Sequence, residues 1–337
     1  MNENQCCCSS GGCCGEATTP TVPTQLTFQD VLGSWKVRFG IGRMNYKVNP
    51  GLYAVGSPDK EAPALVSANY KLTFDSLRKE LSGISCWLLI LDTKGVNVWC
   101  AAGKGTFGTA ELLNRISLVN LPEAVSHRTL ILPQLGAPGI NTSEVKLQSG
   151  FSVEYGPVQA KDIKAFLQSG NHATAEMRTV PFTMLDRLVL TPVEVISAAQ
   201  KLLTAFGVLF MLNLFAVEPF NFMDFIAYAG TVLIGALITP ILLPFIPGRA
   251  FSFKGGLLGI LWAAVTVWWG SLSLLSSIGY VLLLPSISAY LAMNFTGSST
   301  YTSPSGVLKE MKIALPIIVT ASIAGAVLIL LSHIFGI

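Results

Sequence analysis

The chain changes character near residue 190, where short apolar runs separated by polar segments give way to long apolar runs. A helix needs about 20 apolar residues to cross a bilayer. Five runs in the second part reach roughly that length, so we predict an all-α transmembrane bundle of five helices. The predicted spans are residues 195–217, 222–245, 255–275, 278–295 and 313–334. A serine-rich turn at residues 271–277 separates the third span from the fourth.

Basic residues in the loops predict the orientation of the bundle. Cytoplasmic loops carry an excess of Lys and Arg. Such residues lie at the start of the first predicted span, between the second and third spans, and before the fifth span: Arg187, Lys201, Arg249, Lys254, Lys309 and Lys312. We therefore expect a multi-pass protein of the inner (cytoplasmic) membrane, with the N-terminal part in the cytoplasm and the C-terminus outside. Asp224 and His333 lie near predicted helix ends, which favours an anchoring role over conduction.

The first part of the chain alternates between predicted strands and helices. Strands are expected at residues 35–48, 51–56, 86–92, 128–133 and 151–157, and helices at 109–119, 143–150 and 160–170. Residues 63–81 fit either one amphipathic helix or a short strand followed by a helix. The alternation predicts an α/β domain with a parallel sheet and covering helices. We place a disordered Cys-rich tail at residues 1–25, this domain at 26–180, a linker at 181–194 and the transmembrane domain at 195–337.

Composition limits the function classes. The formal net charge is +3 and charged residues make up 12% of the chain, which is too little basic charge to favour nucleic-acid binding. The N-terminus shows no apolar signal-peptide core, so we expect the first part of the protein to stay in the cytoplasm. The protein has seven cysteines, and thiols are kept reduced in that compartment. In that setting, cysteines indicate metal or redox chemistry more readily than a disulfide framework.

The segment Gly95 to Gly108, GVNVWCAAGKGTFG, follows the predicted strand at 86–92. Its glycines match G-x-G-x-x-G, but the next strand ends without the acidic residue that a dinucleotide site needs. Gly105 also follows Lys104 where a Walker loop requires Ser or Thr. Cys100 comes after a buried strand, in a turn where ligands bind, and Lys104 and the following helix would favour its thiolate. Alternatives are a buried small hydrophobe, or a Cys–His pair with His127 or His172.

The stretch NVWCAAGKG, residues 97–105, resembles the cap-helix signature of the HgcA family of mercury-methylating membrane corrinoid proteins. Residues 133–163 are similar to the corrinoid domain of the corrinoid iron–sulfur proteins of the acetyl-CoA pathway. The likeness covers roughly residues 35–163, and the five spans match HgcA. It implies a Rossmann-like corrinoid-binding domain whose cofactor is a cobalamin-type corrinoid with cobalt.

The resemblance implies a role for each residue of the motif. Cys100 would be the lower axial ligand of cobalt and the catalytic residue. The other cofactor-binding residues would be Asn97, Val98, Trp99, Ala101, Ala102, Gly103, Lys104, Gly136 and Gly139. The first three would shape the lower face of the macrocycle, and the small residues would allow close approach. Lys104 would pair with a corrinoid side chain or hold the cap helix. Gly136 and Gly139 would line the cofactor or serve plain turn geometry.

The resemblance also implies an activity and partners. The protein would be a methyltransferase that transfers methyl from cobalt to Hg(II), with the ferredoxin-like HgcB, carrying two 4Fe–4S clusters, as electron donor and another enzyme as methyl donor. The rivals are a methyl carrier of one-carbon metabolism and a non-enzymatic membrane scaffold or transporter. The crowded N-terminal cysteines do not suit a four-ligand cluster. They fit Hg(II) capture, a dispensable tail or acylation: Cys6, Cys7, Cys8, Cys13 and Cys14.

Overall fold

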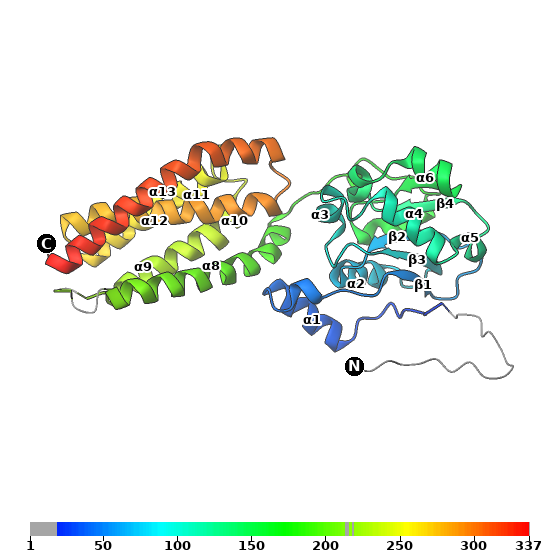
Figure 1. Ribbon diagram of the computed structural model, residues 1–337, viewed down its shortest axis with the longest axis horizontal. Coiled ribbons are helices and arrows are strands. Elements are labelled where there is room, and N and C mark those ends of the chain that lie inside the picture. The colour runs from blue at the N-terminus through cyan, green and yellow to red at the C-terminus, as the bar shows by residue number, and fades with distance from the viewer. Residues whose placement is uncertain (1–18, 213–215, 218, 337) are drawn as a thin grey trace, which may run out of the picture. The chain divides into compact units, whose positions relative to one another are not determined.

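The computed structural model describes residues 19–212, 216–217 and 219–336 (Figure 1). The chain forms two compact units. The first, called the α/β unit here, combines residues up to Val31 with Met44–Thr179. The second, called the helical unit, combines Leu32–Arg43 with the chain from Val180 onward. Leu32–Arg43 therefore group with the helical unit, although the residues that follow them in sequence, Met44–Thr179, belong to the α/β unit.

A five-stranded sheet forms the centre of the α/β unit. Its strands are β1 (Gly51–Val55), β2 (Ala64–Ala68), β3 (Cys86–Leu91), β4 (Thr129–Leu132) and β5 (Ser152–Tyr155). Their order is β1-β3-β2-β4-β5. The pairs β2–β3, β2–β4 and β4–β5 are parallel, with Leu65 opposite Leu88 on one side and Ile131 on the other. Every residue of β2 is buried, as expected for a central strand.

The sequence predicted a parallel sheet. This prediction is wrong for the edge strand β1, because β1 pairs with β3 in the antiparallel direction. The sheet is therefore mixed. The connection from β1 to β2 comprises only residues 56–63. A connection that returns the chain to run parallel needs a dozen or more residues. β1 and β2 consequently run in opposite directions, and β1 becomes an antiparallel edge strand.

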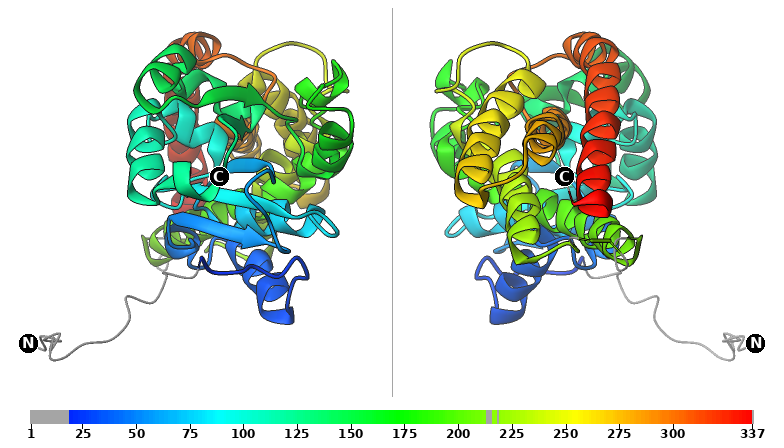
Figure 2. Two further views of the ribbon diagram at one scale, coloured as in Figure 1. Left: turned by 90° about the vertical axis from the view of Figure 1, so that its right-hand side faces the viewer. Right: turned by 90° about the vertical axis from the view of Figure 1, so that its left-hand side faces the viewer.

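Helices cover both faces of the sheet (Figure 2). Alternate side chains of β3 point to opposite faces, so Leu89 and Leu91 belong to one core and Leu88 and Ile90 to the other. The first core contains buried residues of four helices: α3 (Val98–Gly103), α4 (Thr109–Leu118), α5 (Leu121–Ala124) and α6 (Thr142–Ser149). The second contains residues of two helices: α2 (Lys71–Glu80) and α7 (Ile163–Gln168). Residues 63–81 thus form a strand followed by a helix.

The strand expected at residues 35–48 is wrong. Helix α1 (Phe28–Arg38) covers its first residues, and the 3-10 helix η1 (Arg43–Asn45) lies in its second half. Thr27 and Asp30 start the helix as a reciprocal capping pair. The Asp30 amide donates to Thr27 Oγ1 at 3.2 Å, and the Thr27 amide donates to Asp30 Oδ2 at 2.9 Å. Three further 3-10 helices complete the unit: η2 (Gln134–Gly139), η3 (Ala160–Asp162) and η4 (Glu176–Arg178).

The helical unit contains α8 (Met184–Leu212), α9 (Phe222–Leu233), the π-helical turn η5 (Ile234–Ile238), α10 (Thr239–Leu242), α11 (Phe251–Gly270), α12 (Leu274–Asn294), the 3-10 helix η6 (Phe295–Ser298) and α13 (Pro304–Phe335). Among the described residues, five helical segments are long and apolar enough to cross a membrane: Met184–Val208, Phe222–Leu242, Phe251–Gly270, Leu274–Ser298 and Ser305–Phe335. Each predicted span therefore has a helical counterpart. The first helix begins at Met184, inside the range expected to be a linker.

Small residues let the helices of this unit approach closely. A Cβ added to Gly259 of α11 would lie 2.6 Å from the Cα of Pro285 in α12. A Cβ on Gly325 of α13 would lie 2.7 Å from the carbonyl oxygen of Gly279 in α12. Lipid tails are as apolar as the helix surfaces, so membrane helices associate mainly through such close van der Waals packing.

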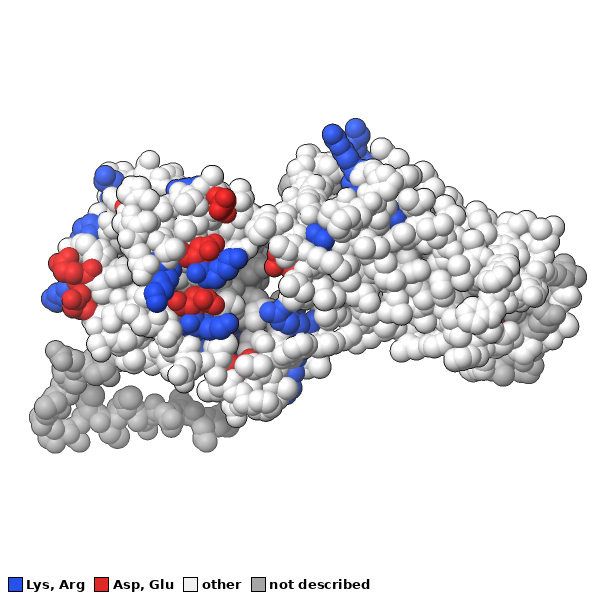
Figure 3. Space-filling model, turned by 180° about the vertical axis from the view of Figure 1, so that it is seen from behind, with Lys and Arg blue, Asp and Glu red and all other residues white. Residues whose placement is uncertain are grey.

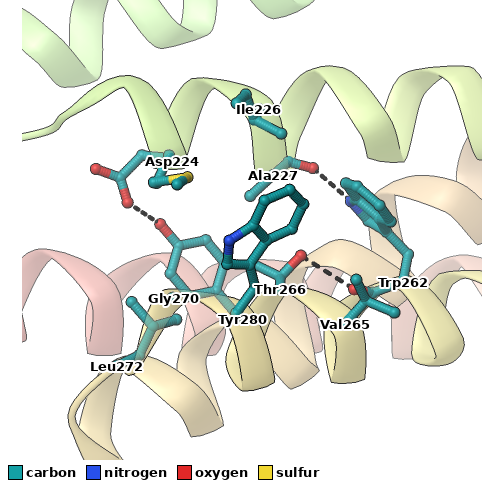
Figure 4. Close-up of a pocket in the computed structure, with 11 residues that line it drawn as sticks. Asp224, Ile226, Ala227, Trp262, Val265, Thr266, Gly270, Leu272 and Tyr280 are labelled. Atoms are coloured by element: carbon teal, nitrogen blue, oxygen red, sulfur yellow. Dashed lines mark hydrogen bonds between the residues drawn. The ribbon is translucent and has the colours of Figure 1, made fainter.

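Polar side chains also connect the helices (Figure 4). Asp224 at the start of α9 is buried and accepts a hydrogen bond from the hydroxyl of Tyr280 in α12. Trp262 of α11 donates its indole N–H to the Ala227 carbonyl at 2.8 Å. A pocket of about 30 Å³ lies beside these groups and is lined by Asp224, Trp262 and Tyr280, among others. Figure 3 shows that Lys, Arg, Asp and Glu gather on the α/β unit and are sparse on the visible face of the helical unit.

Candidate functional site around Cys100

The candidate site lies beyond the carboxyl ends of the parallel strands, where β3 leads through residues 92–97 into α3. Asn69, directly after β2, shapes this loop from the neighbouring strand. Its Oδ1 accepts hydrogen bonds from the amides of Thr93 at 3.1 Å and Gly95 at 3.0 Å, and its Nδ2 donates to Asp92 Oδ1 at 3.1 Å. Asn69 is almost fully buried. It carries no motif that sequence reasoning could detect, and the prediction missed it.

Charged groups fix the other side of the same loop. Glu111 of α4 accepts from the Asp92 amide at 2.9 Å and pairs with Arg115 at 2.7 Å. Lys94 pairs with Asp92, and its hydrogen bond holds the pKa of that carboxyl below its usual range. Lys94 itself has φ 59°, in the left-handed region that costs a non-glycine residue energy. The loop is therefore held in a defined, partly strained conformation ahead of α3.

Cys100 lies in the first turn of α3, not in a turn before a helix as expected from the residues alone. Asn97 is the N-cap, and its Oδ1 accepts a hydrogen bond from the Cys100 amide at 3.0 Å. The cap helix that the family resemblance implied thus has a helical counterpart at these residues. The backbone position of Cys100 is fixed by this cap, while its side chain is exposed.

The two faces of α3 separate the residues proposed for cofactor binding. Val98, Ala101 and Ala102 are buried in the core beneath the helix. The exposed set consists of Trp99, Cys100, Gly103 and Lys104. A Cβ added to Gly103 would meet no heavy atom within 4 Å, so this glycine leaves open surface beside the thiol. Of the three small residues after Cys100, only Gly103 is on the surface.

Gly136 and Gly139 serve close packing between η2 and the segment after α3. A Cβ on Gly139 would lie 2.1 Å from the Phe107 carbonyl oxygen, and one on Gly136 would lie 2.5 Å from the Phe107 ring. Neither has a positive φ in the left-handed range. These glycines hold the turn after β4 against the neighbourhood of Cys100, which accounts for them without a ligand contact.

Other candidate groups lie away from Cys100. His127 comes just before β4, at the amino end of that strand, whereas Cys100 lies beyond the carboxyl ends. The His127 Nε2 is 2.9 Å from the Ala62 carbonyl. His172 follows α7, and its Nδ1 is 2.9 Å from the Gly170 carbonyl. Cys86 is buried at the start of β3, and burial raises the pKa of its thiol to about 12. A Cys–His pair at Cys100 is therefore not formed by either of these histidines.

The donor set determines what metal chemistry this site could support. Within the described parts of the chain, no three His, Cys, Asp or Glu side chains gather closely enough to hold a metal ion. The exposed Cys100 thiol could supply one ligand to a metal whose remaining ligands come from another molecule. The five N-terminal cysteines proposed for Hg(II) capture lie outside the described residues.

Comparisons with known proteins concern the part of the chain before the membrane-capable helices. Residues 32–167 match the family model described as CO dehydrogenase/acetyl-CoA synthase delta subunit. Similar curated proteins are acetyl-CoA decarbonylase/synthase complex gamma subunits. The chain is 32% identical to that of Methanopyrus kandleri over 124 residues and 30% identical to that of Archaeoglobus fulgidus over 143 residues. It is 36% identical to gamma subunit 2 of Methanosarcina thermophila over 117 residues.

These matches cover a limited part of each protein. They include 36%, 41% and 34% of this chain, respectively, and 26%, 30% and 25% of the relatives' lengths. The family match ends before α8, so it includes none of the five membrane-capable helices. The matched region is thus similar to subunits of acetyl-CoA decarbonylase/synthase complexes, and residues 168–337 lie outside the family match.

Proposed function

We propose that this protein is a membrane-bound corrinoid methyl carrier that passes a methyl group to Hg(II), forming methylmercury. The observation that carries the proposal is the exposed Cys100 thiol on a short, capped helix at the carboxyl edge of the sheet. The relatedness to acetyl-CoA decarbonylase/synthase subunits supports methyl-carrier chemistry for the same unit. The five membrane-capable helices support a membrane location, as in the mercury-methylating family that the motif resembles.

The residues present fit a corrinoid. A corrinoid would bring most of the ligands of its own metal, so the chain would need to add one donor rather than a cluster of ligands. The bound corrinoid would supply a cobalt centre that accepts and hands on a methyl group. Cys100 would be that donor, because its backbone is fixed by the Asn97 cap while its side chain is exposed. Open surface beside Gly103 provides room for a broad flat ring.

The neighbouring residues would orient the cofactor. Trp99 is 38% exposed on the surface of α3 and would pack its ring against the edge of the macrocycle. Lys104 at the end of α3 is exposed and would pair with an anionic or amide group on the cofactor's periphery. The cofactor would be held only indirectly by the buried face of α3, which packs into the core and so fixes the helix. That face consists of Val98, Ala101 and Ala102. Gly136 and Gly139 would act through η2, which they pack against Phe107.

The acceptor and partners follow from the chemistry of methyl transfer. The Cys100 thiol would hold the cobalt centre and donate electron density to it, which would suit methyl transfer to an electrophile such as Hg(II). Such transfer would call for an electron donor, such as the ferredoxin-like HgcB, and for a methyl donor enzyme. The N-terminal cysteines would capture Hg(II), a soft ion that thiolates bind well.

The test uses full-length protein purified in detergent and loaded with corrinoid. We expect Cys100→Ala to change the visible cobalt spectrum and to abolish methylmercury formation, and Cys100→His to restore a ligand field but not full methyl transfer. Cys86→Ala is the matched control, since it removes a thiol from the opposite edge of the sheet. Retention of the spectrum and of full methyl transfer by Cys100→Ala would refute the ligand role.

A second candidate is a methyl carrier of one-carbon metabolism without a mercury role. The named relatives favour it, because they are subunits of acetyl-CoA decarbonylase/synthase complexes and so function with protein partners. The same purified protein, methylated once, can be offered either Hg(II) or an acetyl-CoA synthase system with CO and coenzyme A. Transfer to the second acceptor alone would select this candidate.

A further inference from the structure

Helix α1 exposes an apolar face that the proposed methyl-transfer chemistry does not use. Large hydrophobic side chains recur along it at helical spacing: Phe28, Val31, Leu32, Trp35 and Phe39, the last just beyond the helix end. At 100° per residue these positions fall within one stripe about 100° wide. Phe28 is 80% exposed and Trp35 is 58% exposed. Such a stripe on a folded helix marks an interaction surface rather than scattered surface residues.

The opposite face of α1 is tied to the protein. Asp30 pairs with Lys71 of α2 at 2.5 Å and with Arg78 of α2 at 2.7 Å. Val37 is only 2% exposed. The Arg78 guanidinium also donates to the Pro23 carbonyl at 2.6 Å, which fixes the chain ahead of the helix. The helix is therefore held with its apolar stripe directed outward.

The charge pattern around the stripe favours a membrane interface as its occupant. On a helical projection Lys36 falls on one border of the stripe and Arg38 on the other. Basic side chains at the borders of an aromatic-rich apolar face characterise helices that lie in the plane of the bilayer interface. Trp is also enriched at that depth. A protein partner would not require cations along both borders.

The second half of α1 also belongs with the membrane part of the chain. Residues Leu32–Arg43 group with the helical unit. A Cβ added to Gly40, two residues after α1, would lie 3.5 Å from the Val193 side chain of α8, the first membrane-capable helix. The end of α1 is thus adjacent to the segment in which the chain would enter the bilayer.

We propose that α1 is an interfacial helix whose apolar stripe inserts into the headgroup–acyl boundary of an anionic membrane, on the side from which α8 enters. The Asp30 ion pairs attach this helix to Lys71 and Arg78 of α2. The stripe is a lipid-binding surface, distinct from the exposed face of α3 that carries Cys100.

The test places an environment-sensitive fluorescent amino acid at position 35 of the full-length protein in nanodiscs of phosphatidylcholine and phosphatidylglycerol. Position 147 on α6 is the matched control, because Leu147 is also a large apolar residue and is 87% exposed. We expect blue-shifted emission at position 35 and severalfold stronger quenching by lipids brominated on their acyl chains than at position 147. Equal, water-like emission at both positions would overturn the proposal.

Two further comparisons keep the result interpretable. The double variant Lys36→Gln, Arg38→Gln should reduce the quenching at position 35 in anionic nanodiscs, and circular dichroism would verify that it is folded. Wild-type-like quenching in this variant would contradict the role of the basic borders. Emission at position 35 that shifts only after a soluble protein fraction is added would assign the stripe to a protein partner and would also overturn the lipid proposal.

Discussion

At the scale of single residues, Asn69 is the side chain on which the loop before α3 depends. Its Oδ1 accepts from two loop amides, Thr93 and Gly95. In Asn69→Ala the partly buried Gly95 amide loses its acceptor, at a cost of about 1–3 kcal/mol, whereas the Thr93 amide keeps the Leu91 carbonyl as an acceptor at 3.1 Å. We predict hydrogen exchange at Gly95 that is at least about tenfold faster, since about 1.4 kcal/mol corresponds to a factor of ten, and a smaller change at Thr93. Gln148→Ala, an exposed amide on α6, should leave exchange at the loop unchanged.

The same residue shows what sequence could and could not supply at this scale. The position of Cys100 after a buried strand was predicted, because a strand end depends on near neighbours in the sequence, but the N-cap at Asn97 was missed. Asn69 lies 24 residues before Thr93, and only the parallel pairing of β2 with β3 brings them together. The distinction between buried Ala101 and exposed Gly103 likewise required the packing of α3 on the sheet.

At the scale of elements, acid should release α1 from α2. Burial works to raise the pKa of Asp30, but hydrogen bonds from Lys71, Thr27 and Arg78 outweigh it, so the pKa lies well below its usual range. A lowered folded-state pKa gives stability that is present above the unfolded value of about 4 and is lost as pH falls further. We predict increasing hydrogen exchange of α1 amides below about pH 4.

Asp30→Asn tests that assignment at neutral pH. It should open α1 already at pH 7, at a cost of about 1–2 kcal/mol for removing the charge from a partly buried ion pair, and it should flatten the acid response. Asp186→Asn is a matched control, because Asp186 and Thr183 form the same capping pair at the start of α8. An unaltered acid response of α1 in Asp30→Asn would show that another group titrates.

A second prediction at this scale concerns the contact between α12 and α13. Gly325→Leu would drive a side chain into the Gly279 carbonyl and the Leu283 backbone. We predict a loss of about 1–3 kcal/mol, the usual cost of overpacking, seen as a lower melting temperature in detergent. Gly207→Leu on α8 should have little effect, because a Cβ there meets no heavy atom within 4 Å. Equal melting of the two variants would argue against close α12–α13 packing.

Elements defined by local pattern were predictable, and elements defined by partners were not. Strands β3 and β4 were predictable because each is a short continuous apolar run, as buried strands are. The five long helices were predictable from the length of their apolar runs. The direction of β1 depends on a short connection and a distant partner. The segment WKVR at the end of α1 alternates like a strand. It is helical instead because the Thr27–Asp30 cap and the ion pairs to α2 stabilise α1.

At the scale of the whole molecule, the helical unit is polarised from end to end. Arg187 at the start of α8 lies 3.2 Å from both the Ile241 carbonyl in α10 and the hydroxyl of Tyr301, shortly before α13. Lys254 at the start of α11 contacts the Leu243 carbonyl. These contacts place Arg187 and Lys254 at the same end of the unit. Asp224 and His333, 3.8 Å apart, lie at the opposite end, where α9 begins and α13 ends.

This polarity, together with an odd number of spans, predicts the topology. The basic end should face the cytoplasm with the start of α8, and the C-terminus after α13 should emerge on the far side. We expect alkaline phosphatase fused after Ile337 to be active and green fluorescent protein at that position to be dark. Fusions between α10 and α11, after Arg249, should give the reverse pattern. A fluorescent C-terminal fusion would contradict five crossings and would place the start and end of the helical unit on the same side of the membrane.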